Sequence, residues 1–73
     1  MKYTNKLYEL RIDRDLRQED IAKILNTTKQ NYGLYENGKR NLKIEDLAKL
    51  CLFYKVSADY IIGLPQGLEY PKR

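Results

Sequence analysis

Apolar residues recur at helical spacing along most of this chain, and the strict alternation typical of a half-buried strand is absent. The pattern breaks at 13–15, at Asn26, at Asn37 and Gly38, and after Gly63. The expected fold is therefore all-α, a compact five-helix bundle. The expected helices run over about 4–14, about 18–25, from Thr27 or Thr28 to Asn37 and Gly38, about 44–55, and from Ser57 to about Gly63.

The helix ends carry residues that suit them. Thr4 or Asn5 can cap the first helix, and Asn26 tolerates the left-handed backbone of a tight interhelical turn. Gly38 is a natural left-handed stop for the third helix. The inner positions of the helices form the expected core: Leu7, Leu10, Ile21, Ala22, Ile24, Leu25, Tyr32, Tyr35, Ile44, Leu47, Ala48, Leu50, Cys51, Tyr54 and Tyr60.

The 73 residues suffice for one small domain. A chain of this size buries only about 60% of the surface that its unfolded form exposes, so every apolar face is needed. A hydrophobic content of 42% with 33% charged residues is ordinary for a folded domain. We expect a domain over 1–64 and a short irregular tail over 65–73, which is interrupted by prolines and a glycine.

Several functional classes lack their residues in this sequence. One cysteine, Cys51, and no histidine exclude an internal disulfide, the usual zinc sites and histidine-based acid–base catalysis. No apolar run approaches the roughly 18–20 residues of a membrane span, and the opening MKYTNKLYEL has no signal-peptide core. We therefore expect a cytoplasmic protein that is not an enzyme and that uses no metal, cofactor, membrane or small-molecule ligand.

The third expected helix has an unusual outer face. Segment 27–43 carries four basic residues and one acidic residue, which makes it the most positive part of the chain. Glycine inside a helix costs roughly 1 kcal/mol relative to alanine, so Gly33 indicates that another group approaches the backbone closely. The alternative without a binding function is that this face is an ordinary solvated polar surface with one exposed leucine. The side opposite Thr28, Tyr32 and Tyr35 presents Lys29, Gln30, Gly33 and Leu34, with Asn31 at its flank.

The DNA major groove would account for this face. Glutamine and asparagine can bond adenine through two hydrogen bonds, lysine can reach guanine or phosphate, and leucine can pack on a thymine methyl. The positive end of the helix dipole would meet the phosphates. Asn37, Lys39 and Arg40 follow the helix and would lie near the flanking backbone, where contacts position the protein without reading sequence.

The stretch LRQEDIAKILNTTKQNYGLYENGKR resembles the helix-turn-helix of phage repressor and Cro proteins, the XRE-like family. The likeness extends to LYELR at 7–11 and to IEDLAKLCLFYKVSADYIIG at 44–63. It rests on the joint spacing of Gln18, Ala22, Glu36 and Gly38 with the later VSADYIIG. The resemblance implies the phage-repressor DNA-binding fold, with the helix-turn-helix at about 18–36. It also implies a bacterial or phage-encoded protein that is nucleoid-associated when bound.

The resemblance also implies a role for each matching residue. Gln18 would contact a phosphate and brace the start of the third helix, and Glu36 would form a structural pair with Arg11. Lys29, Gln30 and Leu34 match base-contacting positions, and Asn31 lies near base or backbone. The expected DNA-binding residues are Arg17, Gln18, Lys29, Gln30, Asn31, Gly33, Leu34, Asn37, Lys39 and Arg40.

The sequence departs from the family pattern at a few positions. Arg17 replaces the usual serine or threonine cap of the second helix, which weakens capping but adds a potential phosphate contact. Asn26 replaces a frequent turn glycine, and Tyr32 fills a core site usually held by a smaller aliphatic residue. Gly33 and Leu34 are less polar than is typical, so fewer direct hydrogen bonds to bases are expected.

A homodimer is expected because small domains of this kind usually read palindromes as two-fold dimers. At least one of Leu52 and Phe53 in the fourth helix should point outward. Further apolar residues at the C-terminal end could extend this exposed apolar patch. The alternative is that the tail folds over the domain's own core. The expected interface consists of Leu52, Phe53, Ile62, Leu64, Leu68 and Tyr70.

The function favoured by these observations is a sequence-specific regulator of transcription that binds double-stranded DNA. A repressor that reads a palindromic operator through the major groove is the preferred form. An antitoxin or regulatory adaptor on the same fold, with a protein as main partner, is the alternative. The seven tyrosines could instead stack single-stranded bases, but their helical spacing favours use in the core.

Overall fold

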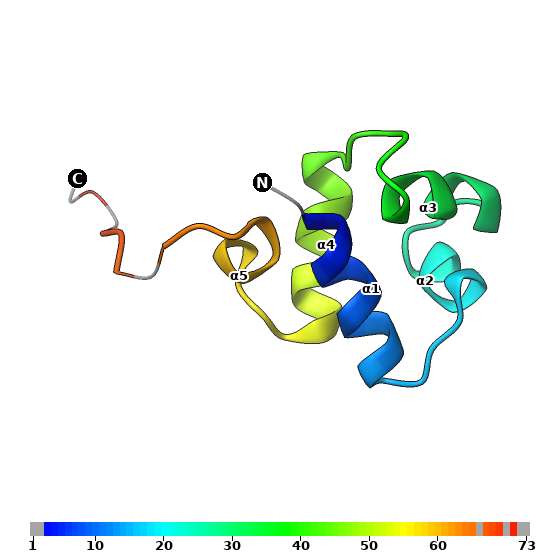
Figure 1. The fold of residues 1–73 in the computed structure, drawn as a ribbon, viewed down its shortest axis with the longest axis horizontal. Coiled ribbons are helices and arrows are strands. Elements are labelled where there is room, and N and C mark those ends of the chain that lie inside the picture. The colour runs from blue at the N-terminus through cyan, green and yellow to red at the C-terminus, as the bar shows by residue number, and fades with distance from the viewer. Residues whose placement is uncertain (1–2, 66, 70, 72–73) are drawn as a thin grey trace.

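The computed structural model describes residues 3–65, 67–69 and 71. Its helices are α1 (Tyr3–Asp13), α2 (Gln18–Ile24), α3 (Lys29–Glu36), α4 (Ile44–Tyr54) and α5 (Ala58–Ile62) (Figure 1). No strand occurs in the described ranges. The expected all-α, five-helix fold is confirmed, although α1 already includes Thr4 and Asn5, so the expected cap at either residue is wrong.

The two longest helices, α1 and α4, lie side by side in the middle of the molecule. Near the start of α1, the Tyr3 hydroxyl accepts a hydrogen bond from the backbone N–H of Leu42 at 3.0 Å. Just beyond its end, the Arg14 side chain donates to the carbonyl of Tyr54 at 3.0 Å. The pair α2 and α3 packs on one side of this centre, and α5 packs on the other (Figure 1).

The local chemistry of the helix ends follows the sequence. The hydroxyls of Thr28 and Ser57 cap α3 and α5, accepting backbone N–H groups at 3.0 and 3.3 Å. Asn26 adopts a φ of 56°, the left-handed conformation expected in the α2–α3 turn. Gly38 has a φ of 79°, where a side chain would strain the backbone, and it ends the turn after α3. Asn26 and Thr28 therefore set where α3 begins, and Gly38 follows its end.

Three tyrosines take a large share of the core. Tyr32 and Tyr35, one turn apart on α3, are fully buried, and their rings meet edge to face with centroids 6.5 Å apart. Aromatic pairs favour this arrangement because the positive ring edge faces the negative ring surface. The buried apolar residues are Leu7, Leu10, Ile21, Ala22, Leu25, Tyr32, Tyr35, Leu50, Tyr54 and Ile61.

Three residues expected in the core lie at the surface instead. Ile44 is 79% exposed, Ala48 is also exposed, and Tyr60 is 46% exposed. The expectation for Ile44 and Ala48 is wrong because another face of α4 packs inward, and Asp46 is buried at the start of that face. Tyr60 lies outside the core, where the Lys6 ammonium sits 4.7 Å from its ring centroid.

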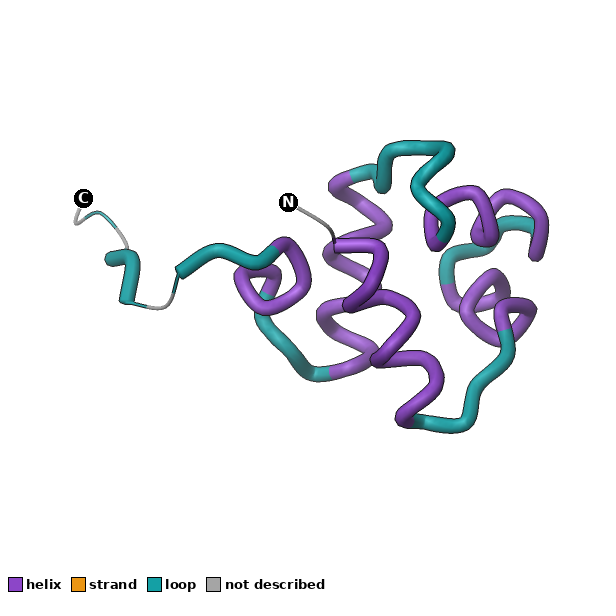
Figure 2. Tube along the Cα trace, in the orientation of Figure 1, coloured by secondary structure: helices purple, strands orange, loops and turns teal. Residues whose placement is uncertain are grey.

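The tail leaves the helical body. From Leu64 onward the described segments run away from α5, and they contain no helix (Figure 2). Leu64 is 37% exposed and Leu68 is 61% exposed. The alternative in which the tail folds over the core is therefore wrong for the part of the tail that is described.

Candidate nucleic-acid interface

The turn between α2 and α3 holds the two helices at a fixed angle. The Thr27 backbone N–H donates to the carbonyl of Ala22 at 2.9 Å, which closes the turn after α2. The small side chain of Ala22 is buried at this helix pair. Thr28 then caps α3 as described above. These contacts join the end of α2 to the start of α3 and orient α3 relative to α2.

A buried ion pair anchors the C-terminal end of α3. The guanidinium of Arg11 donates two hydrogen bonds to the carboxylate of Glu36, each at 2.8 Å. The side chains are 11% and 5% exposed, respectively. A third N–H of the same guanidinium donates to the carbonyl of Leu16 at 3.0 Å. The pair that the sequence resemblance implied is present, and it ties α1 to α3.

The charges of this pair support each other. Burial opposes the charge on Glu36, but the hydrogen bonds and positive charge of Arg11 outweigh it and hold the pKa of this carboxyl below its ordinary value. The hydrogen bonds with Glu36 raise the pKa of Arg11, against the opposing effect of burial. Both groups are therefore ionised at neutral pH, which gives α3 an electrostatic anchor beneath its outer face.

Gln18 braces α3 at a different place from the expected one. Its side-chain N–H donates to Glu36 at 3.4 Å, at the end of α3, whereas the sequence had predicted a brace at the start of that helix. The same side chain lies near Gly33, where a Cβ atom would be 3.4 Å from the Gln18 oxygen, a van der Waals distance that leaves room for alanine. Within the chain, the group nearest to Gly33 therefore comes from α2.

The first turn of α3 presents its side chains to solvent. Lys29 and Gln30 are exposed, and Leu34, one turn after Gln30, is half-buried. Asn31 is also half-buried, and its side chain is engaged within the protein, since its N–H donates to the Thr27 hydroxyl at 2.9 Å and its oxygen accepts from Arg40. The predicted readout residues thus share one face, but they differ in how freely their side chains can reach a ligand.

The residues predicted to meet a DNA backbone lie directly before α2 and directly after α3. Asn37, Lys39 and Arg40 are exposed after the end of α3, where the backbone N–H groups of residues 39 and 40 donate to the carbonyl of Leu34 at 2.9 and 3.1 Å. The side chain of Arg17 at the start of α2 is 82% exposed. This side chain provides no cap hydrogen bond, as expected for arginine in place of serine or threonine, but the backbone N–H of Arg17 donates to the Asp20 carboxylate at 2.8 Å.

One contact that stabilises this interface was missed from the sequence. The Tyr35 hydroxyl donates to the buried carboxylate of Asp46 at 2.9 Å and joins α3 to α4. Burial and this hydrogen bond raise the pKa of Tyr35 above its ordinary value. The only available signal was an acidic residue in the first turn of a helix, which usually has a solvent-exposed explanation.

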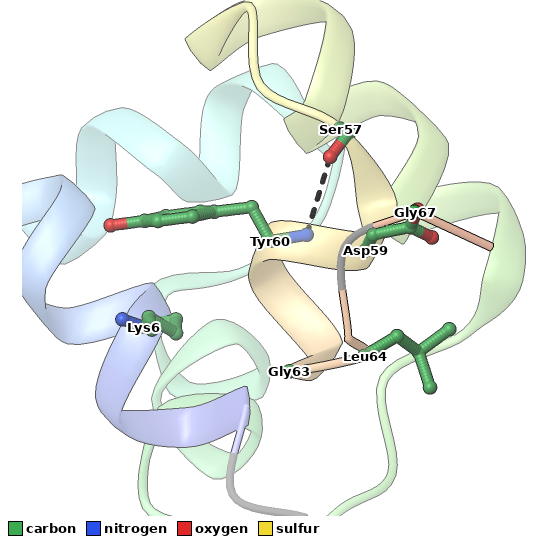
Figure 3. A pocket seen from close by; sticks show the side chains of 7 residues that line it. All are labelled: Lys6, Ser57, Asp59, Tyr60, Gly63, Leu64 and Gly67. Atoms are coloured by element: carbon green, nitrogen blue, oxygen red, sulfur yellow. Dashed lines mark hydrogen bonds between the residues drawn. The ribbon is translucent and has the colours of Figure 1, made fainter.

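Of the expected dimer residues, Leu52 and Phe53 lie on the central helix α4, whereas Ile62, Leu64 and Leu68 lie in or beyond α5, at the end of the molecule away from α3 (Figure 1). Leu52 is 80% exposed and Phe53 is 38% exposed, so the prediction that at least one points outward is confirmed. Ile62 is half-buried, and Tyr70 lies outside the described residues. A hollow of about 440 Å³ adjoins this end, lined by Lys6, Ser57, Asp59, Tyr60, Gly63, Leu64 and Gly67 (Figure 3).

Other kinds of site find no support in the described residues. No group of three or more side chains of the metal-binding kinds comes together in residues 3–65, 67–69 and 71. Over the same ranges, no helix is both long enough and apolar enough to cross a membrane. Cys51 is half-buried, and burial raises the pKa of its thiol, which is unfavourable for a nucleophile.

Comparison with known proteins decides the family. The family model described as helix-turn-helix matches residues 7–61, from α1 to α5. The chain belongs to the helix-turn-helix family. Within that family it is of the phage repressor and Cro type, as the sequence resemblance implied.

Two curated relatives and one solved structure illustrate the range of similar helix-turn-helix proteins. The chain is 39% identical over 54 residues to the cryptic phage CTXphi transcriptional repressor RstR of Vibrio cholerae, covering 74% of the chain and 49% of the relative. It is 36% identical over 62 residues to the uncharacterized HTH-type transcriptional regulator YobD of Bacillus subtilis (strain 168), covering 85% of the chain and 55% of the relative. The chain thus spans about half the length of these relatives.

The fold of a transcriptional regulator from Listeria innocua, known from a crystal structure, superposes with a TM-score of 0.83 at 25% sequence identity. The match covers 94% of this chain and 64% of that one. The arrangement of all five helices is therefore shared with an experimentally determined regulator.

Proposed function

We propose that the protein binds double-stranded DNA in a sequence-dependent manner through α3 and regulates transcription, in the simplest form as a repressor that occludes its operator. The observation that carries this proposal is the two-sided character of α3. Tyr32 and Tyr35 fix one side in the core, whereas Lys29 and Gln30 in the first turn are exposed. Proteins with a helix-turn-helix place the N-terminal residues of the second helix against base edges in the major groove.

The exposed side chains suit base recognition. Gln30 can donate to and accept from one adenine, and Lys29 can donate to the acceptors of a guanine. The half-buried Leu34 offers an apolar surface for a thymine methyl. With these three residues as the readout set, each good bidentate pair discriminates against a wrong base by roughly 1–3 kcal/mol.

Exposed cations before α2 and after α3 suit the phosphate backbone. Arg17 begins α2, and Lys39 and Arg40 follow α3, with Asn37 as an additional donor. Each phosphate neutralised lowers the slope of log K against log salt concentration by about 0.9. Three such cations would therefore contribute a slope of roughly −2.7 for each bound domain.

A homodimer is part of this proposal. Leu52 and Phe53 leave apolar surface exposed on the central helix α4, and Leu64 and Leu68 leave more in the segment after α5, at the end of the molecule away from α3 (Figure 1). A two-fold axis at this end would place one α3 on each side of it. Half-sites of a palindromic operator, about 34–36 Å apart, would then each receive one helix.

The chain offers a matched control for the dimer. Leu52 and Ile44 are 80% and 79% exposed on the same helix, but only Leu52 belongs to the proposed interface. Sedimentation equilibrium should give a dimer for the wild type and for Ile44→Glu, and a monomer for Leu52→Glu. A wild-type monomer at high concentration, both with and without DNA, would contradict the dimer.

A second candidate is an antitoxin or adaptor whose main partner is another protein. The exposed Leu52 and Leu68 favour it, since apolar surface at one end can bind a different chain. The exposed polar turn of α3 favours DNA, because such a turn has no use in an apolar interface.

Selection from a pool of random duplexes at physiological salt tests the proposal. The wild type should enrich a motif with two inverted half-sites about one helical turn apart. The matched control is a variant with Lys29, Gln30 and Leu34 all changed to alanine, which retains the core and should enrich no motif. Absence of enrichment by the wild type would contradict sequence-specific binding and favour the protein-partner alternative.

A further inference from the structure

Both polar atoms of the Asn31 side-chain amide form hydrogen bonds within the protein. Its N–H donates to the Thr27 hydroxyl at 2.9 Å, and its oxygen accepts a hydrogen bond from the Arg40 guanidinium. Its backbone N–H is bound as well, by the hydroxyl of Thr28 at 3.0 Å. The orientation of the Asn31 amide is therefore fixed by its own protein.

This arrangement conflicts with base reading by Asn31. A bidentate contact with adenine requires the amide oxygen and an amide N–H to face the same base edge. In Asn31 the oxygen already faces Arg40 and an N–H faces Thr27. The amide keeps one further N–H and one further lone pair, but its direction is set by these two contacts, and turning it toward a base would break both. The neighbouring Gln30 is exposed and can present its amide directly.

The same contact holds Arg40 in place. The backbone N–H of Arg40 is bound to the Leu34 carbonyl at 3.1 Å, and its side chain reaches back to Asn31 in the first turn of α3. The positive charge of Arg40 lies close enough to Tyr35 to oppose the rise in the pKa of that residue. A guanidinium has five N–H donors, so the contact with Asn31 leaves donors for a phosphate oxygen.

We propose that Asn31 is a positioning residue that holds the Arg40 guanidinium beside the first turn of α3 for contact with a DNA phosphate, and that Asn31 does not read a base. This inference rests on the proposed function. Its physical basis is preorganisation: an arginine that is already ordered loses less conformational freedom when it binds. The pair then acts as one phosphate-binding unit.

A double-mutant cycle tests the inference. Binding of Asn31→Ala, Arg40→Ala and the double variant is measured by fluorescence anisotropy against a selected duplex and a scrambled duplex of equal length, at 50 and 200 mM salt. Asn31→Ala should weaken binding to both duplexes by the same factor, and the double variant should lose no more than Arg40→Ala alone. Loss of one phosphate contact makes the negative salt slope shallower by about 0.9, so on going from 200 to 50 mM salt the affinity of Arg40→Ala should rise about 3.5-fold less than that of the wild type.

The matched control pairs Asn31→Ala with Lys39→Ala. Lys39 is adjacent to Arg40 and is also exposed, but no hydrogen bond joins its side chain to Asn31 among the described residues. The factors by which Asn31→Ala and Lys39→Ala weaken DNA binding should multiply in the double variant. If the losses of Asn31→Ala and Arg40→Ala multiply as well, or if Asn31→Ala changes the preference at a single base pair, the inference is wrong.

A measurement without DNA separates this inference from the proposed function. The heteronuclear NOE of the Arg40 Nε–Hε group should indicate an ordered side chain in the free wild type and a mobile one in Asn31→Ala. Arg17, whose side chain is 82% exposed, is the internal reference for mobility. An Arg40 as mobile as Arg17 in the wild type overturns the inference even if DNA binds. A wild type that binds neither duplex overturns the proposed function.

Discussion

Replacing Arg11 by methionine should cost this domain a large part of its stability. The substitution keeps a long side chain but removes both 2.8 Å hydrogen bonds to Glu36, whose side chain is only 5% exposed. Removing one partner of a buried ion pair costs about 3–5 kcal/mol because the other charge stays buried without compensation. Since the Arg11 side chain is 11% exposed and Gln18 still contacts Glu36, we expect the lower end, about 3 kcal/mol.

That loss is large for a chain of 73 residues. Typical stabilities of about 0.05–0.15 kcal/mol per residue give roughly 4–11 kcal/mol for the whole domain. Each 1 kcal/mol shifts the Tm of a domain of this size by about 4–8 °C, so Arg11→Met should lower the Tm by about 12–24 °C. Urea unfolding followed by circular dichroism at pH 7 measures the free energy directly.

The chain supplies its own control for this experiment. Arg17 and Glu19 form an exposed pair at 3.4 Å, with side chains 82% and 51% exposed. Exposed pairs contribute about 0–1 kcal/mol, so Arg17→Met should change the stability by less than about 1 kcal/mol. If Arg11→Met costs no more than Arg17→Met, the pair between α1 and α3 does not stabilise the domain as argued.

The pH dependence gives a second check of the same pair. The pKa of Glu36 lies below its ordinary value in the folded state, so its stabilising effect is fully present above the unfolded pKa, about 4.3, and is lost as the pH falls through the folded pKa. The difference in unfolding free energy between wild type and Arg11→Met should therefore shrink from pH 7 to pH 3. A difference that stays constant or grows would contradict the assignment.

Other substitutions test the glycines, the α3–α4 contact and the readout. Gly38→Ala should lower the unfolding free energy by about 1–2 kcal/mol in urea titrations, because residue 38 has a positive φ. Gly33→Ala should raise the unfolding free energy by up to about 1 kcal/mol, because residue 33 is helical and a Cβ atom there would make van der Waals contact only. Tyr35→Phe should cost about 1–3 kcal/mol in the same titrations, since it leaves the buried carboxylate of Asp46 without its hydroxyl partner. Gln30→Ala should cost roughly 1–3 kcal/mol of binding at one base pair, measured by anisotropy on single-pair variants of the selected duplex, and equal losses on every duplex would remove Gln30 from the readout set.

The helices and their ends could be predicted from the sequence because their determinants are local. Thr28, Ser57, Asn26 and Gly38 act on backbone within a few residues, so their roles can be read from position alone. The pairing of Arg11 with Glu36 was implied by family resemblance, since the two residues are 25 positions apart and no local pattern connects them.

The remaining contacts depend on how the helices pack. Asp46 faces inward on the same side of α4 as the buried Leu50 and Tyr54, where the Tyr35 hydroxyl, 11 positions earlier, donates to it. Ile44 and Ala48 are exposed at the surface. Periodicity alone favoured the apolar residues for that inner face. The neighbour of Gly33 could not be predicted from the sequence either. The glycine indicated that another group lies near the backbone of α3, but only the packing of α2 against α3 identifies that group as Gln18.

The central claim is that the first turn of α3 and the segment after it meet DNA. Titration of the 15N-labelled protein with a selected duplex, followed by backbone amide shifts, tests it most directly. We predict the largest changes at 28–34 and at 39–40, and little change in α5. Largest changes along the outer face of α4 and in α5, with α3 unaffected, would contradict the claim.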